Sequence, residues 1–246
     1  MTITSAITAG EILNRVAVEV GFDAVAEPYA SPEQHFKQMQ YLLQTCGEEL
    51  ALAYQWEFLN GSESITTLDT DSGDYPLPAD FHYMIPQTGW ERSQNVPLIG
   101  PLSAQDWTYL LGRDLVNQTI YASFRMKDGL FSIFPRPPPN GLDINYEYQS
   151  RYWVANGGDT ADLKSNIVVG ADVPLYDRTL ITRMLKLKFL EAKGFDTTAP
   201  QADFNQVFGF LTGKDKSGEI ISAGRSLGNY PYLDVFRNSP DTGYGQ

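Results

Sequence analysis

The sequence is poor in the residues that most often perform chemistry. Its 246 residues include one cysteine, Cys46, and two histidines, His35 and His82. A single cysteine can form neither an internal disulfide nor a cysteine-based metal cluster. The two histidines lie far apart, and neither belongs to a pattern such as His-x-x-x-His. Cys46 falls within a helical pattern, so we expect a buried, inert thiol, and we expect no zinc site.

Long apolar runs are also absent. No window reaches the roughly 20 apolar residues that a helix needs to cross a bilayer. Residues 1–10 lack the basic start and the apolar run of a signal peptide. We therefore expect a protein that is made in the cytoplasm and has no membrane partner.

Positive charge is in short supply. Lysine and arginine number 18 against 30 aspartates and glutamates, which gives a net charge of −12. Such a chain repels nucleic-acid phosphate, so sequence-specific DNA binding is not expected. An acidic surface would suit a channel through which DNA slides without being held. Solubility alone also explains the charge.

Motifs for nucleotide chemistry and acyl transfer are missing. The sequence contains no Gly-x-Ser-x-Gly elbow and no Walker-type loop. Residues 213–218 (GKDKSG) resemble a phosphate loop in composition, but the strand that should precede such a loop is lacking. We expect no cofactor.

The carboxylates do not form a recognisable catalytic pair. Glu48 and Glu49 are adjacent on one expected helix and therefore point to different faces. Residues 69–74 (DTDSGD) alternate acids as a calcium loop does, but the closing glutamate of an EF-hand is absent. Turn formation explains these aspartates, because aspartate bonds its own backbone. We predict that the protein is not an enzyme; a hydrolase acting through unrecognised carboxylates is the alternative that activity screening would expose.

Two helices are predicted near the N-terminus. Thr8 and Glu11 fit a capping box, and apolar residues then recur at helical spacing to Gly21, which predicts a helix over residues 9–20. Ser31 and Pro32 favour a second start, with Ser31 as the N-cap. This second helix is expected over residues 32–54.

The pattern then changes to the period of two that is typical of strands. Asn60-Gly61 predicts a tight turn, and residues 64–68 alternate as a strand. A short helix is expected after Ser103, with an inward face that consists of Trp107, Leu110 and Leu111. Residues 120–125 and 130–134 predict a hairpin through Asp128-Gly129. Residues 142–148 predict a further half-buried strand.

Helical spacing returns after Pro174. An apolar stripe predicts a helix that ends near Gly194, and a last helix is expected over residues 200–212. Residues 214–246 have no helical stripe and are rich in small and polar residues, which predicts an extended arm. The fold class expected is α+β: an α-helical bundle (residues 1–56 and 156–213), an inserted β-rich domain (57–155) and an extended C-terminal arm (214–246).

The expected arm carries large apolar groups in a segment that offers them no partner. Burial of such a side chain is favourable by about 1.5–3 kcal/mol. A neighbouring chain offers that burial most readily, although the arm could instead fold back over its own domain. The expected interface residues, toward a portal or a neighbouring subunit, are Tyr230, Tyr232, Leu233, Val235, Phe236 and Arg237.

The four tryptophans allow a second hypothesis. Trp56, Trp90, Trp107 and Trp153 could form a sugar-binding platform, as in a carbohydrate-binding or tail-fibre-like module. Packing in the core or at an interface explains the same residues. A glycan array with Trp90→Ala and Trp153→Ala would separate the two.

Three stretches resemble a known family. They are residues 53–59 (AYQWEFL) at the end of the second helix, residues 75–81 (YPLPADF), and residues 192–196 (AKGFD) before the expected arm. The chain resembles the head-to-tail adaptors of short-tailed bacteriophages, also called tail tubular protein A or head-completion connector proteins. The resemblance covers most of the chain, although each motif is short.

This resemblance implies a structural virion protein in the neck or tail. It implies a ring of about twelve copies, docked on the portal protein by C-terminal arms. The other face would receive a tail nozzle or tail tube protein. Viral DNA would pass through the lumen without specific binding.

Overall fold

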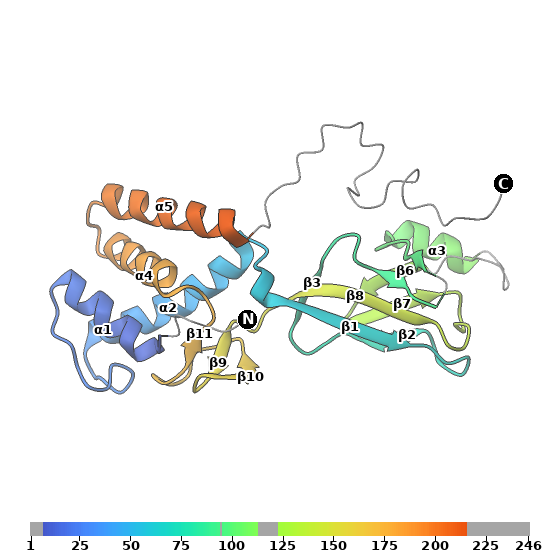
Figure 1. Ribbon diagram of the computed structural model, residues 1–246, viewed down its shortest axis with the longest axis horizontal. Coiled ribbons are helices and arrows are strands. Elements are labelled where there is room, and N and C mark those ends of the chain that lie inside the picture. The colour runs from blue at the N-terminus through green and yellow to red at the C-terminus, as the bar shows by residue number, and fades with distance from the viewer. Residues whose placement is uncertain (1–6, 94, 113–122, 216–246) are drawn as a thin grey trace, which may run out of the picture.

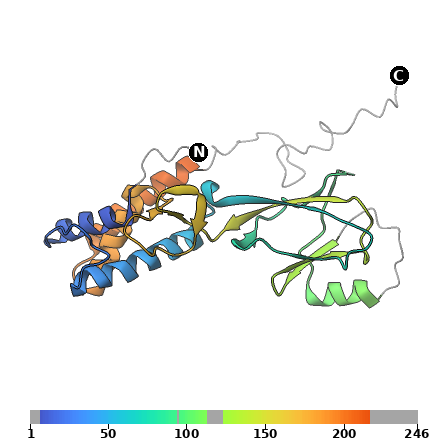
Figure 2. The ribbon, with the colours of Figure 1, turned by 90° about the horizontal axis from the view of Figure 1, so that it is seen from below.

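The computed structural model describes residues 7–93, 95–112 and 123–215, and its buried hydrophobic side chains form two separate clusters. We call residues 7–59 and 151–215 the helical lobe, and residues 60–93, 95–112 and 123–150 the β lobe. The two lobes lie end to end along the long axis of the molecule (Figures 1 and 2). The chain passes from the helical lobe into the β lobe and back again.

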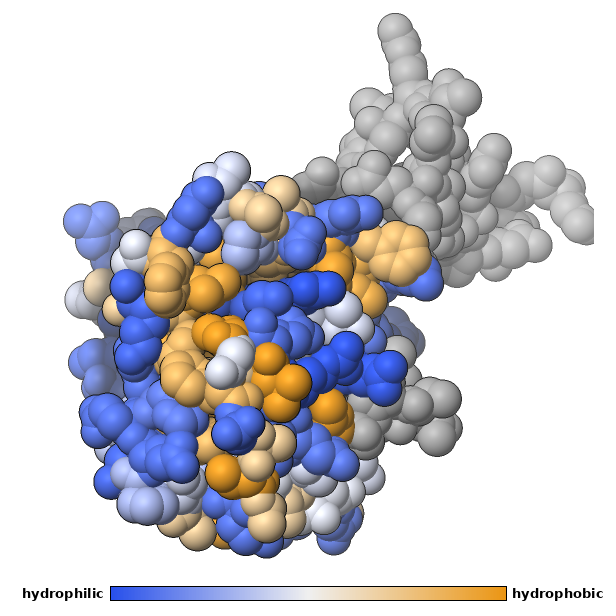
Figure 3. Space-filling view, turned by 90° about the vertical axis from the view of Figure 1, so that its left-hand side faces the viewer, coloured by the Kyte–Doolittle hydropathy of each residue, from blue (hydrophilic) through white to orange (hydrophobic). Residues whose placement is uncertain are grey.

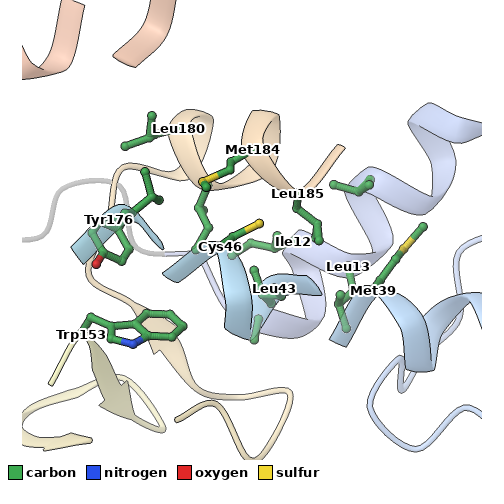
Figure 4. Packing of buried hydrophobic residues seen from close by; sticks show 14 of the residues in the cluster. Ile12, Leu13, Met39, Leu43, Cys46, Trp153, Tyr176, Leu180, Met184 and Leu185 are labelled. Atoms are coloured by element: carbon green, nitrogen blue, oxygen red, sulfur yellow. The ribbon is translucent and has the colours of Figure 1, made fainter. Parts of the chain in front are cut away.

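Four helices form the helical lobe: α1 (Ala9–Val20), α2 (Gln34–Ala53), α4 (Arg178–Ala192) and α5 (Thr198–Asp215). Helix α4 packs against each of the other three. Apolar side chains from α1, α2 and α4 meet in the core (Figure 4), among them Ile12, Leu43 and Leu185, which are fully buried. Cys46 lies in this core, as expected, and burial raises the pKa of its thiol to about 12.

The first predicted helix is confirmed in detail. The Thr8 hydroxyl accepts from the Glu11 backbone N–H, the Glu11 carboxylate accepts from the Thr8 N–H, and Gly21 ends the helix with a φ of 94°. The predicted start of the second helix is wrong. Its N-cap is Glu33, with no side-chain capping bond, and Ser31 instead accepts from the Glu33 N–H two residues further on. A serine can close such a local turn in place of a helix cap.

A small three-stranded sheet completes the helical lobe. It consists of β9 (Val154–Asn156) between β10 (Asp159–Lys164) and β11 (Val173–Pro174). Trp153 and Val154, which lie within the expected β-rich insertion, pack in the core of the helical lobe. These two residues return the chain from the β lobe to the helices.

Two antiparallel sheets form the β lobe. In one, β8 (Asp143–Ser150) pairs with β1 (Asn60–Thr66), β3 (Phe81–Met84) and β4 (Trp90–Glu91), and β4 pairs in turn with β5 (Val96–Pro97). In the other, β7 (Leu130–Phe134) lies between β2 (Asp74–Pro76) and β6 (Ser123–Lys127). Aromatic rings join the two sheets: Phe131 of β7 stacks on Tyr146 of β8 with 4.9 Å between centroids.

The predicted hairpin is present as β6 and β7, although residues 120–122 of the first strand lie outside the described residues. Asp128 and Gly129 adopt φ angles of 54° and 75° between them. The turn predicted at Asn60-Gly61 is wrong, because both residues belong to β1. A Cβ at Gly61 would lie 2.6 Å from the ring of Tyr148, so this glycine makes room for an aromatic side chain.

Helix α3 (Ala104–Gly112) is the expected short helix after Ser103, whose hydroxyl accepts from the Asp106 N–H. Trp107 is buried as predicted. Leu111 is 51% exposed, so the prediction that it faces inward is wrong.

The α+β fold class is confirmed, with the β lobe inserted between α2 and α4. The late helices are confirmed as α4 and α5, which extend to Ala192 and Asp215. Residues 216–246, which include nearly all of the expected arm, lie outside the described residues.

Candidate interaction surfaces

The six predicted interface residues belong to the part of the chain that the structure does not describe. Tyr230, Tyr232, Leu233, Val235, Phe236 and Arg237 all follow Asp215, the last described residue. Their role at a portal or subunit interface therefore stays a prediction. The structure does show where this segment leaves the folded protein.

The departure point lies at the junction of the two lobes. The Asp215 carboxylate accepts from the Glu57 backbone N–H at 3.1 Å, and the Tyr54 hydroxyl donates to the Thr212 carbonyl at 3.2 Å. Both contacts join the end of α5 to the residues that lead from α2 into β1. The segment that follows therefore begins beside the base of the β lobe.

Hydrogen bonds from buried side chains hold the junction itself. The indole Nε1 of Trp56 donates to the Leu50 carbonyl at 2.7 Å, which fixes the chain as it leaves α2. Gln149 Nε2 donates to the Trp56 carbonyl at 3.1 Å. The strand that enters the β lobe and the strand that leaves it are thus tied together at their shared end.

An aromatic cluster supports the junction from the helical side. Trp153 lies against α2 at Gly47, and Tyr176 donates its hydroxyl to the Gly47 carbonyl at 2.9 Å. The rings of Trp153 and Tyr176 have centroids 5.8 Å apart, and Trp56 meets Tyr176 edge-on at the same distance. Burial raises the pKa of the Tyr176 hydroxyl well above its usual value, so this group acts as a hydrogen-bond donor.

Charged side chains hold α3 on the β lobe. The Arg136 guanidinium forms an ion pair with Asp74, and its carbon lies 5.3 Å from the centroid of the Trp107 ring. The hydrogen bond from Arg136 lowers the pKa of Asp74, and this effect outweighs the cost of burial. The contact orients the helix that precedes residues 113–122.

A second charged group organises the loop beside α1. Asp172 is fully buried, pairs with Lys164 at 2.8 Å, and accepts from the Val168 N–H at 2.7 Å. The Ala9 N–H donates to the Asp172 carbonyl at 2.7 Å, which joins this loop to the start of α1. Burial alone would raise the pKa of Asp172, but Lys164 and the backbone donors lower it.

The helical lobe also exposes large apolar side chains. Phe195, between α4 and α5, and Phe210, on α5, are each 61% exposed, and Val18 on α1 is 58% exposed. None of the 18 residues of α5 is fully buried. Figure 3 shows apolar side chains among polar ones on the end of this lobe, where α1 ends and α4 turns into α5 (Figure 1). The sequence pattern marked the apolar residues on the inner side of α5 but did not show that Phe210 lies exposed on this helix.

The tryptophans do not assemble into a platform. Trp56 and Trp153 are buried in the helical lobe, and Trp107 is buried on the inner side of α3 in the β lobe. Trp90 lies in the β lobe, with the Arg92 guanidinium 5.7 Å from its ring. This dispersal removes the structural basis that the carbohydrate-binding alternative requires.

Two of the acidic residues singled out in the sequence illustrate their use in packing. Asp71 accepts from the Leu68 N–H and from the Tyr75 hydroxyl, each at 2.9 Å. Glu49 pairs with Lys188 at 2.8 Å. Within the described ranges, no three acidic, histidine or cysteine side chains converge as a metal ion requires. No described helix is long and apolar enough to cross a bilayer.

The fold and these surfaces define an elongated α+β protein whose recognisable features serve packing and contact. The chain matches the model of the SU10 adaptor protein family over residues 7–219. It therefore belongs to that family, and it is a phage adaptor protein, a component of the virion that interacts with other head and tail proteins. An adaptor family is not a family of enzymes. No curated protein matches the chain.

Proposed function

We propose that this protein is the head-to-tail adaptor of a tailed phage, which forms a ring between the portal protein and a tail nozzle or tail tube protein. The observation that carries the proposal is the family match, which spans both lobes. A closed ring of identical subunits needs two different contact surfaces on each subunit. An elongated chain with two lobes offers them at different places along its length.

Apolar exposure on the helical lobe supports contact between copies. Phe195, Phe210 and Val18 keep more than half of their surface in contact with water in the single chain. The apolar residues on one side of α5 pack against the core of the helical lobe. The opposite side of the helix is therefore free to meet another subunit. We assign the α5 side of the helical lobe to the interface between neighbouring copies.

The C-terminal segment supplies the second contact. The six predicted interface residues, which lie from Tyr230 to Arg237 and exclude Pro231 and Asp234, would be buried on the portal or on a neighbouring subunit. The segment starts at the junction, beside Asp215, so it can leave the ring from between the lobes. The charge of −12 suits a lumen through which DNA moves without being held.

The test uses the full-length protein and a variant that ends at residue 224. Each is mixed with the cognate portal protein and examined by mass photometry and electron microscopy. We expect the full-length chain to form a ring of defined copy number on the portal, of about twelve subunits. We expect the shortened chain to remain folded and to lose portal binding.

Two results would count against the proposal. A full-length chain that stays monomeric and does not bind portal would refute the adaptor ring. Undiminished portal binding by the shortened chain would refute the role of the C-terminal segment and leave the ring standing.

A further inference from the structure

The β lobe contains a groove that its own described residues leave empty. Its volume is about 500 Å³, within the range of about 300–1,000 Å³ that is typical of ligand sites. It lies between β3 with the loop that follows it, the end of β5 with the residues after it, and β6. The lining is mainly apolar and includes Phe81, Met84, Pro86, Pro97, Leu98 and Phe124.

Prolines and aromatic rings in one groove suit an extended, proline-containing peptide. Such peptides dock in aromatic-lined grooves because proline fixes φ and little conformational entropy is lost on binding. The residue before a proline is also held extended. The lining therefore selects for a short stretch that alternates proline with large apolar side chains.

The groove is not wholly apolar, because His82 and Tyr83 also line it. A ligand that carries a hydroxyl beside an apolar body suits such a lining, and tyrosine is the residue of that kind.

One segment of the chain outside the described residues has this chemistry. Residues 229–233 read NYPYL, in which Pro231 lies between Tyr230 and Tyr232. Tyr230 follows Asp215 by 15 residues, so an extended chain reaches at most about 50 Å from the junction. A lobe of about 90 residues has a radius of gyration of only about 12 Å. The segment can therefore pass beyond its own β lobe to the next one.

We propose that the groove of each β lobe binds residues 229–233 of a neighbouring copy. The inference rests on the proposed ring, which brings the copies together, and it assigns part of the predicted interface to a subunit contact. Tyr230 and Tyr232 would enter the groove. Val235 and Phe236 follow this stretch and remain available to the portal.

Cysteine cross-linking in full-length chains tests the proposal. Met126→Cys places a thiol in the groove, and Tyr232→Cys places one on the segment. The native Cys46 should not interfere, because it is buried and burial raises its pKa to about 12. The two single variants are mixed under mild oxidation. We expect cross-linked dimers that contain one chain of each kind.

Two controls make the result specific. Tyr41→Cys replaces a side chain on α2 that is 80% exposed, and mixed with Tyr232→Cys it should give little cross-linking. In the Met126→Cys and Tyr232→Cys mixture, the added change Tyr230→Ser should lower the yield about tenfold, since one buried tyrosine contributes more than the 1.4 kcal/mol that a factor of ten requires.

Three outcomes would overturn the inference. A double variant, Met126→Cys with Tyr232→Cys, that cross-links only within one chain would place the segment in its own lobe. A second double variant carries Met126→Cys and Val116→Cys. A cross-link between these two cysteines, together with no reaction between residues 126 and 232, would show that residues 113–122 fill the groove. Absence of any cross-link while mass photometry shows rings would refute the groove site alone, whereas absence of rings would refute the proposed function.

Discussion

The ring of Trp153 occupies the space that a Cβ atom on residue 47 would need, so only glycine fits at this position. A Cβ built at Gly47 would lie under 3.0 Å from three atoms of that ring, and Trp153 is almost fully buried. We predict that Gly47→Ala destabilises the protein by about 1–3 kcal/mol, because a packed core does not accept the added methyl group. Urea unfolding followed by tryptophan fluorescence measures the change.

Gly209 provides the matched control for this prediction. It lies in helix α5, and no atom outside its own helix lies within 4 Å of the Cβ that it lacks. Gly209→Ala should stabilise the protein by about 0.5–1 kcal/mol, since alanine favours helices over glycine. Equal losses of stability in both variants would show that the close approach of Trp153 is unimportant.

Tyr176→Phe tests the hydrogen bond beside this contact. The change removes the hydroxyl that donates to the Gly47 carbonyl at 2.9 Å in a buried site. We expect a loss of about 0.5–1.5 kcal/mol in the free energy of unfolding. Tyr41→Phe, at an 80% exposed position, should change it by less than about 0.5 kcal/mol.

Arg136→Lys should loosen α3 from the β lobe. Lysine keeps the charge but lacks the planar group that pairs with Asp74 and covers the Trp107 ring. Hydrogen exchange measured by mass spectrometry should become faster in Ala104–Gly112 and stay unchanged in α1. Lys127→Ala, which removes an exposed surface pair with Asp128, is the control and should leave both regions unchanged.

The loop around Asp172 predicts a dependence of stability on pH. Lys164 and backbone N–H groups hold the pKa of Asp172 below its unfolded value despite burial. A carboxyl with a lowered folded pKa stabilises the protein above its unfolded pKa of about 4 and loses that effect as pH falls through the folded pKa. Urea unfolding should show Asp172→Asn to be less stable than the native chain at pH 7. The difference should shrink below about pH 4. A constant difference at all pH values would contradict the prediction.

Phe210→Ser tests the assigned interface between copies. The side chain is 61% exposed, so the stability of the single chain should change by less than about 0.5 kcal/mol. Ring formation on the portal, measured by mass photometry, should be weakened. A variant that forms rings as well as the native chain would remove α5 from that interface.

Some local signals in the sequence predicted the observed geometry, and others did not. The capping box at Thr8 and the turn at Asp128-Gly129 were identified because their bonding is complete within a few residues. The turn expected at Asn60-Gly61 was wrong because the distant ring of Tyr148 decides the use of that glycine. The N-cap predicted at Ser31 was wrong for a related reason, since a serine hydroxyl can close a turn as readily as it caps a helix.

Surfaces were harder to predict than elements. Phe210 looks like an ordinary helical apolar residue until the packing of α5 on α4 shows which side of the helix is covered. The groove of the β lobe is lined by residues within 81–101 and by β6, which folding brings together from distant parts of the sequence. The role of the six C-terminal residues rests on their composition and stays a prediction, because they lie outside the described residues.

The connection between the lobes determines how the molecule would carry a mechanical load. Asn60 and Gln149 are direct partners in the ladder of β1 and β8, and both strands meet the helical lobe at this end. Tension between the lobes would pull both strands in the same direction, so it would not slide one past the other. The load would pass from β8 to β3 and β4, its other neighbours, and into the body of the sheet. In each subunit, two paired strands would thus share a force that pulls the lobes apart.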